Sequence, residues 1–354
     1  MISGANLKIM FNRFIFGLSM IVIGHFISAC VKPPTNLPEY VFKGDTMGTY
    51  WVAKVATDQP ISDQVLLTKI QNSIEKELMA VNQDYSTYIP NSLLEQFNAF
   101  ESSKEFSVHA DFISMLEIAK LVHVESGGLY DVTIDPLVRL WGFGPNKVLE
   151  APAQTKIAHV LNFIGFEKLS WSNDNFKLKK NHPKLRVDLS SIAKGRGVDR
   201  VFELLQKKYS FQNILVEIGG EVRAAGVNKM QQPWSVGVEL PSEVLGAGVA
   251  KVISLKNESV ATSGSYRNYK KYNNKKYSHT LNPKTGHPID SDLISASVIA
   301  IDCTRADAWA TAMMAMGAEK AMEVANKNKL KVILLVLNKD ESLKVLESEM
   351  MKTN

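Results

Sequence analysis

Cysteine is almost absent from this chain of 354 residues, which contains only Cys30 and Cys303. Two cysteines cannot form the set of disulfides that stabilises small secreted domains. With 45% hydrophobic and 22% charged residues, the composition is that of a chain able to bury a substantial core. We therefore expect a globular protein that is stabilised by packing and not by covalent cross-links.

The sequence also lacks a long basic stripe, an internal repeat and any low-complexity segment beyond a short proline-rich stretch. Its formal net charge is +5, but lysines and arginines are interleaved with acidic residues over most of the chain. A nucleic-acid partner is therefore not expected. Residues 187–199 match neither the P-loop pattern GxxxxGK[ST] nor the GxGxxG fingerprint, so the common nucleotide-binding folds are disfavoured.

One long apolar run is present, and it lies near the N-terminus at residues 14–27. Basic residues precede it and small residues follow it, an order that is typical of an export signal. The segment Ile27-Ser-Ala-Cys30 resembles a bacterial lipobox, in which the cysteine is acylated. A transmembrane anchor is the alternative, but the run is short for a membrane span and contains His25.

These features predict how the chain is processed and where it resides. We expect residues 1–29 to be a lipoprotein signal peptide, residues 30–40 to be a lipidated Cys30 with its tether, and residues 41–350 to be the functional domain. Acyl chains such as palmitate contribute about 0.8 kcal/mol per buried CH₂, so a multiply acylated cysteine anchors a protein stably. The expected location is the periplasmic face of a membrane in the bacterial cell envelope.

The spacing of apolar residues predicts two long helices and several strands. One helix is expected over residues 62–83, capped by Ser62, and another from His109 to Ser126. Interleaved with other helices, short apolar runs predict strands at residues 185–189, 213–218, 234–238, 251–255 and 293–301. The chain is therefore predicted to be a mixed α/β protein of the α+β kind.

The segment from Asp188 to Gly195 is the first candidate for site chemistry. Asp188 ends a predicted strand, a serine-rich turn follows, and Lys194 lies at the start of a predicted helix. Backbone amides at a helix start, with a lysine beside them, suit a phosphate group. We therefore predict that this segment binds a phosphate.

A second candidate lies near the C-terminus, where Asp307 and Thr311 are four residues apart on a helix predicted to be capped by Thr304. Both side chains would project from one helix face and could share a hard cation such as Mg²⁺. Alternatively, Asp307 could simply favour the helix N-terminus electrostatically. His279 could be a general base or an ordinary hydrogen-bonded polar residue.

Eight segments, taken in order, resemble the ApbE family of FAD:protein FMN transferases over most of the chain, from about Val41 to Glu347. They are TMGT (46–49), STY (86–88), DVTIDPLVRLWGFGP (131–145), VDLSSIAKG (187–195), EIGGEVRAAG (217–226), TSGSYRN (262–268), YSHTLNPKTGHPI (277–289) and ADAWAT (306–311). The resemblance implies an ApbE-like fold, with mixed sheets and flanking helices in two lobes around a central FAD site.

The resemblance also implies which residues form that site. Mg²⁺ would be bound by the main-chain carbonyl of Ser191 and by the side chains of Asp307 and Thr311. Many family members have Gly or Ala at the position of Ser191, a difference that a main-chain ligand tolerates. FAD would be bound by Met47, Tyr88, Leu129, Tyr130, Asp131, Asp188, Lys194 and Leu281.

The implied reaction is Mg²⁺-dependent transfer of FMN from FAD to a Thr or Ser hydroxyl of an exported redox protein, with release of AMP. His279 and Asp188 are alternative general bases. Acceptors in this family carry a sequence similar to D-G-x-[ST]-G-A-[ST], and subunits of Na⁺-pumping NADH:quinone oxidoreductase or of Rnf-type complexes are the usual ones. This chain contains no such sequence, so modification of itself is not expected.

Two other functions are compatible with parts of the same pattern. An FAD pyrophosphatase would use water in place of the acceptor hydroxyl and would produce FMN and AMP. A non-catalytic FAD-binding lipoprotein would need neither the pair Asp307 and Thr311 nor His279, so the presence of these residues counts against it.

Overall fold

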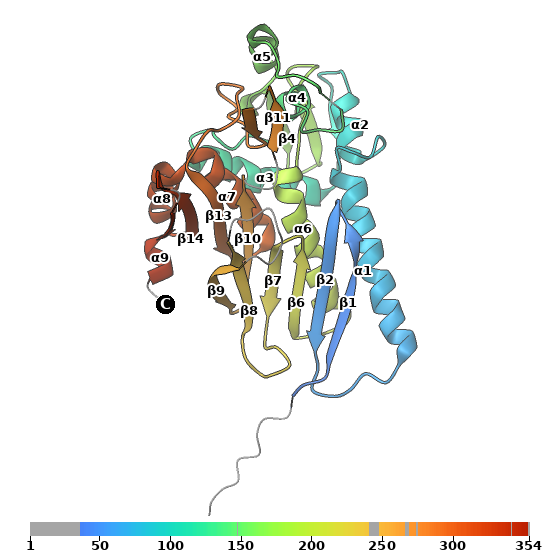
Figure 1. The fold of residues 1–354 in the computed structure, drawn as a ribbon. Coiled ribbons are helices and arrows are strands. Elements are labelled where there is room, and N and C mark those ends of the chain that lie inside the picture. Colours follow the sequence, from blue (N-terminus) through green and yellow to red (C-terminus); the bar gives the residue numbers. More distant parts are fainter. Residues whose placement is uncertain are drawn as a thin grey trace, which may run out of the picture. The chain divides into compact units, whose positions relative to one another are not determined.

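An antiparallel sheet of eight strands forms the centre of the fold (Figure 1). The computed structural model describes residues 36–146, 148–240, 248–265, 269–273, 275–340 and 342–352, so the expected signal peptide, Cys30 and the first part of the tether lie outside the described residues. In spatial order the strands of the sheet are β1 (Glu39–Thr46), β2 (Thr49–Ala56), β6 (Asn213–Ile218), β7 (Glu221–Ala225), β10 (Glu258–Gly264), β13 (Leu293–Ala300), β14 (Lys331–Leu337) and β15 (Leu343–Glu347).

Helices cover one face and the upper end of this sheet, and three small sheets complete the described part of the fold (Figure 1). The helices are α1 (Gln64–Tyr85), α2 (Leu93–Ala99), α3 (Ala110–Glu125), α4 (Asp135–Leu140), α5 (Gln154–Leu161), η1 (Phe166–Lys168), α6 (Ser190–Glu203), its π-helical continuation η2 (Leu204–Lys208), α7 (Cys303–Met316), α8 (Ala318–Lys327) and α9 (Glu349–Lys352). The small sheets pair β3 (Phe106–Ser107) and β4 (Leu169–Ser172) with β5 (Lys177–Lys180), β8 (Trp234–Glu239) with β9 (Val249–Leu255), and β11 (Tyr269–Tyr272) with β12 (Lys275–Ser278).

The two faces of the large sheet bury different apolar cores, because side chains alternate along each strand. On β2, Trp51, Ala53 and Val55 are buried in the core that includes residues of α1 and α6. Leu215 of β6 and Val222 of β7 lie in a separate core with residues of β8 and β9. The helices that carry the candidate site residues therefore belong to one face, and the β8–β9 hairpin belongs to the other.

A smaller apolar cluster forms the upper part of the molecule in Figure 1, around α4, α5 and β11. Trp141 lies in this cluster, and its Nε1 donates a hydrogen bond to the Gly286 carbonyl at 2.8 Å. The Tyr272 hydroxyl donates to the carbonyl of Trp141 at 2.9 Å. The first bond ties the segment after β12, which carries His279, to Trp141 at the end of α4, and the second ties β11 to the same residue.

The predicted mixed α/β class is confirmed, as are most of the predicted elements. α3 begins after His109, whose Nδ1 accepts a hydrogen bond from the Phe112 N–H, and ends within the predicted range. α1 begins at Gln64, so the prediction of Ser62 as its cap was wrong. Asp63 caps this helix instead, because its carboxylate accepts hydrogen bonds from two amides of the first turn.

The predicted strand at residues 185–189 is wrong, because only an isolated bridge between Arg186 and Ile134 forms there. The Val187 N–H donates to the side-chain oxygen of Asn98 at 2.7 Å, and the side-chain amide of Asn98 donates to the Val187 carbonyl at 2.8 Å. Asn98 therefore satisfies both main-chain groups that a neighbouring strand would otherwise bind. The segment is extended and buried without belonging to a sheet.

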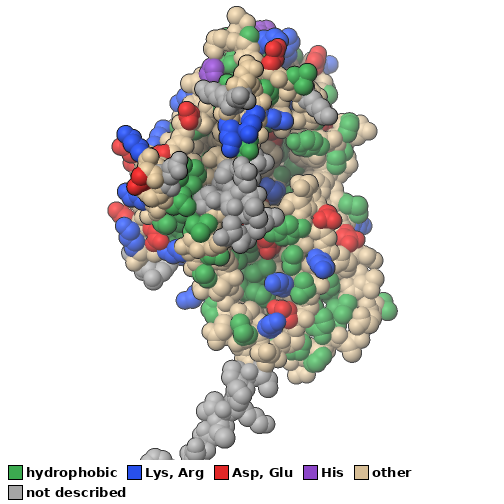
Figure 2. Space-filling view, viewed as in Figure 1, with side chains coloured by type: hydrophobic (Ala, Val, Ile, Leu, Met, Phe, Trp, Pro, Cys, Tyr) green, Lys and Arg blue, Asp and Glu red, His purple; other side chains and the backbone are tan. Residues whose placement is uncertain are grey.

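Acidic and basic side chains are interspersed over the face of the molecule shown in Figure 2. Hydrophobic side chains lie between them on the described part of this face. Within the residues that the structure describes, no helix combines the length and the apolar character that a membrane span requires.

Candidate active site

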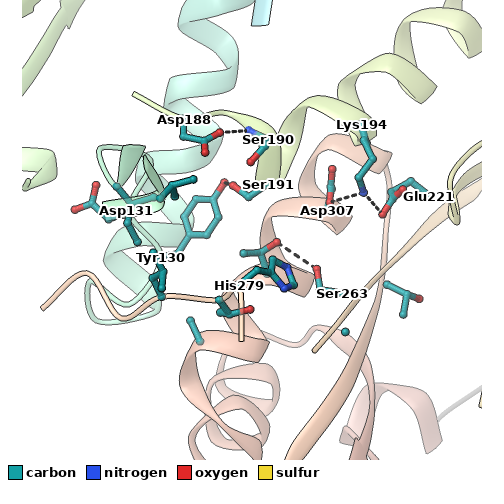
Figure 3. Close-up of a pocket in the computed structure, with 18 of the residues that line it drawn as sticks. Tyr130, Asp131, Asp188, Ser190, Ser191, Lys194, Glu221, Ser263, His279 and Asp307 are labelled. Atoms are coloured by element: carbon teal, nitrogen blue, oxygen red, sulfur yellow. Dashed lines mark hydrogen bonds and ion pairs between the residues drawn. The ribbon is translucent and has the colours of Figure 1, made fainter. Parts of the chain in front are cut away.

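One cavity of about 490 Å³ brings together all the residues that the sequence predicts for FAD and Mg²⁺. It lies where α6, α7, β7 and β10 meet the segments at residues 129–138 and 279–281 (Figure 3). The predicted residues that line it are Met47, Tyr88, Leu129, Tyr130, Asp131, Asp188, Ser191, Lys194, His279, Leu281, Asp307 and Thr311.

Lys194, Glu221 and Asp307 line one end of the cavity, which is called here the charged end. Helices α6 and α7 approach each other closely at Gly195, directly after Lys194. A Cβ atom on Gly195 would lie 2.3 Å from the Cys303 carbonyl oxygen and 2.9 Å from Cβ of Asp307. The Gly195 N–H donates to Oδ2 of Asp307 at 2.9 Å. In a regular α-helix that N–H would donate to the carbonyl of Ser191. The carboxylate of Asp307 is thereby held beside the turn of α6 that presents the Ser191 carbonyl.

Asp199 of α6 fixes the start of α7, a role that the sequence pattern did not reveal. Its carboxylate accepts hydrogen bonds from the N–H groups of Cys303 at 3.0 Å and Thr304 at 2.8 Å, and from the Thr304 hydroxyl. Arg223 donates to the same carboxylate at 2.7 Å. A buried carboxylate with these donors acts as a helix cap supplied by another helix. The position of Asp307, one turn further along α7, follows from this contact.

The prediction that Thr304 caps α7 is therefore wrong. The N-cap is Asp302, whose carboxylate accepts a hydrogen bond from the Arg305 N–H at 2.9 Å. Thr304 lies within the first helical turn, where its hydroxyl donates to Asp199. A cap must lie outside the helix with extended main-chain angles, and Asp302 meets this condition.

Lys194 projects from α6 between two buried carboxylates, those of Glu221 and Asp307 (Figure 3). Its Nζ forms a short ion pair with Oε1 of Glu221 and lies 3.9 Å from Oδ1 of Asp307. Burial disfavours the charged lysine, but the two carboxylates outweigh burial and raise its pKa. Lys194 is therefore a fixed positive charge at the cavity wall, as a group that binds phosphate must be.

Glu221 was not predicted as a site residue, although it lies within the family-like segment at residues 217–226. It begins β7 directly after the turn formed by Gly219 and Gly220, both of which have positive φ angles. Its Oε2 atom is buried and has no hydrogen-bond partner among the described residues. Burial raises the pKa of Glu221, while Lys194 opposes this shift. The double glycine before a glutamate was the available signal for this residue.

Asp188 lies between the charged end and the opposite end of the cavity. Its N–H donates to the Val132 carbonyl at 2.7 Å, and its Oδ1 accepts a hydrogen bond from the Ser190 N–H at 2.8 Å. Burial, together with the nearby Asp135 carboxylate, raises the pKa of Asp188 to about 6 from its ordinary value of 3.8. This carboxyl group can therefore change its protonation state close to neutral pH.

The opposite end of the cavity is lined by apolar and aromatic groups and is called here the ring end. Tyr88 is 64% exposed, and its hydroxyl donates to the Phe143 carbonyl at 3.3 Å. The carboxylate of Asp131 accepts hydrogen bonds from Thr133 and from the Phe166 N–H. Asp131 thus stabilises its own loop. The other apolar residues at this end are Leu129, Ile134, Val138 and Leu281.

The two candidate bases approach the cavity from different sides. Figure 3 shows the His279 ring on the side away from Asp188. The ring of His279 lies edge-on to Phe143, with 6.4 Å between their centroids. Near the metal candidates, Oγ of Ser263 and Oγ1 of Thr311 are 3.2 Å apart, so these hydroxyls share a hydrogen bond. An acceptor hydroxyl in this cavity could therefore meet either an imidazole or a carboxylate.

The donor set at the charged end suits a single hard cation. Within the described residues, no three side chains of His, Cys, Asp or Glu are grouped as metal ligands. Among the residues that line the cavity, Asp307 has a carboxylate, Thr311 has a hydroxyl and Ser191 has a main-chain carbonyl, which are all oxygen donors. Mg²⁺ prefers oxygen ligands and keeps several waters, so a site with few protein ligands is sufficient. The unpartnered oxygen of Glu221 adds negative charge nearby.

Comparison with known proteins identifies the family. The model of the ApbE family matches residues 47–334. The chain is 37% identical to FAD:protein FMN transferase from Haemophilus influenzae over 92% of this chain and 93% of the relative. It is 37% identical to the protein of the same name from Vibrio cholerae over 89% and 91% of the two chains.

Solved structures of similar proteins have the same fold. The structure of flavin transferase ApbE from Vibrio cholerae superimposes with a TM-score of 0.80 at 35% identity, over 89% of this chain and 99% of that one. The apo form of the flavinyl transferase ApbE from Pseudomonas stutzeri gives a TM-score of 0.79 at 30% identity, over 90% and 96%. This chain therefore belongs to the ApbE family.

Proposed function

We propose that this protein transfers FMN from FAD to a Thr or Ser hydroxyl of another protein in an Mg²⁺-dependent reaction that releases AMP. One observation carries the proposal. A single cavity places the carboxylate of Asp307 and the cation of Lys194 at one end, and Tyr88 with apolar groups at the other. This arrangement suits a substrate that has a pyrophosphate in its middle and a flat ring at its end. The names of the similar proteins support the same reaction.

In the proposed reaction, the acceptor oxygen forms a bond to the FMN-side phosphorus, and the bond from that phosphorus to the bridging oxygen breaks. AMP leaves with the bridging oxygen, and the hydroxyl proton passes to a base of the protein. When bound by Asp307, Thr311 and the Ser191 carbonyl, Mg²⁺ would offset negative charge on the pyrophosphate. Lys194 would offset charge from the other side, and the rigid contact between α6 and α7 would keep these groups in place.

His279 is the proposed base, with Asp188 as the alternative. Imidazole accepts a proton near neutral pH. The Asp188 carboxylate already accepts a hydrogen bond from the Ser190 N–H. We expect His279→Ala to bind FAD with unchanged affinity and to lose transfer, measured by flavin fluorescence of the acceptor on a denaturing gel. Transfer that persists in His279→Ala but disappears in Asp188→Asn would assign the base to Asp188.

We further propose that the protein acts outside the cytoplasm, anchored by a lipidated Cys30 at the periplasmic face of a membrane. Its acceptors would be exported redox proteins with a D-G-x-[ST]-G-A-[ST]-like sequence, such as subunits of Na⁺-pumping NADH:quinone oxidoreductase or of Rnf-type complexes. The support is the order of an apolar run, small residues and Cys30 at the N-terminus. Mass spectrometry of the purified mature protein tests the anchor, since an unmodified N-terminus would contradict it.

The decisive experiment combines the protein in detergent with FAD, Mg²⁺ and an acceptor that carries the target sequence. The intact mass of the acceptor should rise by the mass of an FMN group, with one AMP released per acceptor. The matched control replaces the target hydroxyl residue of the acceptor with Ala, and a second control adds a chelator. AMP release without acceptor would favour an FAD pyrophosphatase. Bound but intact FAD and an unmodified acceptor would indicate a non-catalytic FAD-binding lipoprotein.

A further inference from the structure

The two carboxylates that flank Lys194 are not equivalent. Glu221 and Asp307 are both almost fully buried. Lys194 contacts Glu221 at hydrogen-bonding distance, whereas its Nζ is 3.9 Å from Oδ1 of Asp307, which is too far for a hydrogen bond. The lysine therefore has a preferred partner, and that partner is the carboxylate outside the proposed metal site.

The two oxygens of the Asp307 carboxylate have different neighbours. Its Oδ2 already accepts the hydrogen bond from the Gly195 N–H. Its Oδ1 faces Lys194 at the longer distance and is the oxygen that remains for a cation. An ammonium in direct contact with this oxygen would occupy its lone pairs and would repel a divalent ion at the same place. Asp307 can serve a metal only if Lys194 is held away from it.

Glu221 is well placed to hold the lysine. It follows the tight turn of Gly219 and Gly220 and pairs with Ile218 across the β6–β7 hairpin, so its main chain is fixed. In Figure 3, the Lys194 side chain reaches between Asp307 and Glu221. Its interaction with Glu221 leaves it at the cavity wall.

We infer that Glu221 is a positioning residue that draws the Lys194 ammonium away from Asp307 and so keeps Asp307 available for the divalent cation. The inference rests on the proposed metal site, and it assigns Glu221 a role that does not require direct contact with the metal. Without Glu221, Lys194 would move to Asp307, its nearest remaining carboxylate, and would compete with the cation there.

The test is a double-mutant cycle that measures the affinity for Mn²⁺ by electron paramagnetic resonance. It uses the full chain in detergent without FAD or acceptor. Glu221→Gln should lower the affinity at least about tenfold, which lies within the usual range of coupling between neighbouring sites. In the Lys194→Met background, the same substitution should lower it by no more than about threefold, because no ammonium remains to move. Thermal unfolding of each variant verifies that it is folded.

A matched control removes the charge of another glutamate in the β6–β7 hairpin. Glu217 lies on β6, and its carboxylate accepts a hydrogen bond from the Tyr50 hydroxyl at 2.6 Å, away from Lys194. Glu217→Gln should leave Mn²⁺ affinity within about twofold, since Glu217 does not line the cavity and its half-buried charge is partly screened by solvent.

The outcomes separate this inference from the proposed metal site. An equal fold-loss for Glu221→Gln with and without Lys194 would overturn the inference and would show that Glu221 acts on the metal directly. The inference would also be overturned if Glu221→Gln lowered the Mn²⁺ affinity in neither background. If the wild-type protein binds no Mn²⁺, the proposed metal site is contradicted, and so is the role of Glu221 that depends on it.

Discussion

The charged end and the ring end of the cavity are built from different kinds of structure. The charged end comes from two helices and a strand that are packed against one another, and its carboxylates are almost fully buried. The ring end comes mainly from turns and loop segments, and its aromatic residue Tyr88 is 64% exposed. Groups that stabilise charge during a reaction must be held rigidly, whereas a ring can be bound by surfaces that adapt.

This difference predicts that substitutions at the two ends have separable effects. Changes at the charged end should lower the rate of transfer or the stability of the α6–α7 contact. Changes at the ring end should weaken FAD binding and leave the rate at saturating FAD nearly unchanged.

The largest effect is expected for Asp307→Asn. The substitution removes the charge of the only acidic metal candidate on α7, and transfer should fall at least about 100-fold, as for loss of a key electrostatic group. The rate of FMN transfer at saturating FAD measures this. Asp302→Asn is the control, because it changes the cap of the same helix outside the cavity, and its rate should stay within about twofold of wild type. A wild-type rate of transfer by Asp307→Asn would show that the charge of Asp307 is not needed for the reaction.

Asp199→Asn should destabilise the charged end without touching the cavity. Asp199 is not among the residues that line the cavity, but it binds two N–H groups of α7 and the guanidinium of Arg223. Removing one partner of a buried ion pair costs about 3 to 5 kcal/mol. Urea denaturation should show a loss of this order in the free energy of unfolding. A loss below about 1 kcal/mol would mean that α7 does not depend on this contact.

Asp188→Asn should stabilise the folded protein at neutral pH. The folded protein raises the pKa of this carboxyl group from 3.8 to about 6, so it binds a proton more tightly than the unfolded chain does. The free energy of unfolding therefore falls as the pH rises through this window, and the ionised carboxylate is unfavourable above it. A neutral Asn should raise the free energy of unfolding at pH 7.5 by about 2 to 3 kcal/mol. The gain should vanish near pH 4, and an equal gain at both pH values would contradict this explanation.

Tyr88→Ala should have the smallest effect, and that effect should be on binding. Loss of an exposed aromatic surface raises the dissociation constant of a stacked ring system by about five- to tenfold. Fluorescence titration with FAD measures the constant, and transfer at saturating FAD should remain within about twofold of wild type. Tyr88→Phe, which keeps the ring and loses only the hydroxyl bond to Phe143, should bind almost as well. A lower rate at saturation would show that the ring end also positions the reacting phosphorus.

Patterns within a single element predicted much of the candidate site. Asp307 and Thr311 are one helical turn apart, so their common face follows from the helix period alone. The helix from residue 110 to residue 125 and the strand at residues 213–218 were likewise evident from local spacing. The order of the family segments then indicated that these elements meet at one site. Each of these predictions depended on neighbours in the chain.

The failures concern contacts between elements that are distant in the sequence. The main chain near Arg186 is satisfied by the side chain of Asn98, 89 residues away from Val187, so no strand forms. Thr304 donates to Asp199 instead of capping α7, and Glu221 has its role only because Lys194 projects toward it from another element. Side-chain partners of this kind leave no periodic signal.

By itself, the sequence determined the mixed α/β class, the elements with clear periodicity and the residue types of the site, because these depend on local spacing and composition. Only the tertiary structure decided which carboxylate pairs with Lys194, which residue holds the start of α7 and how near neutrality Asp188 titrates. These properties depend on burial and on distances of a few ångströms between charges, which the folding of the whole chain sets.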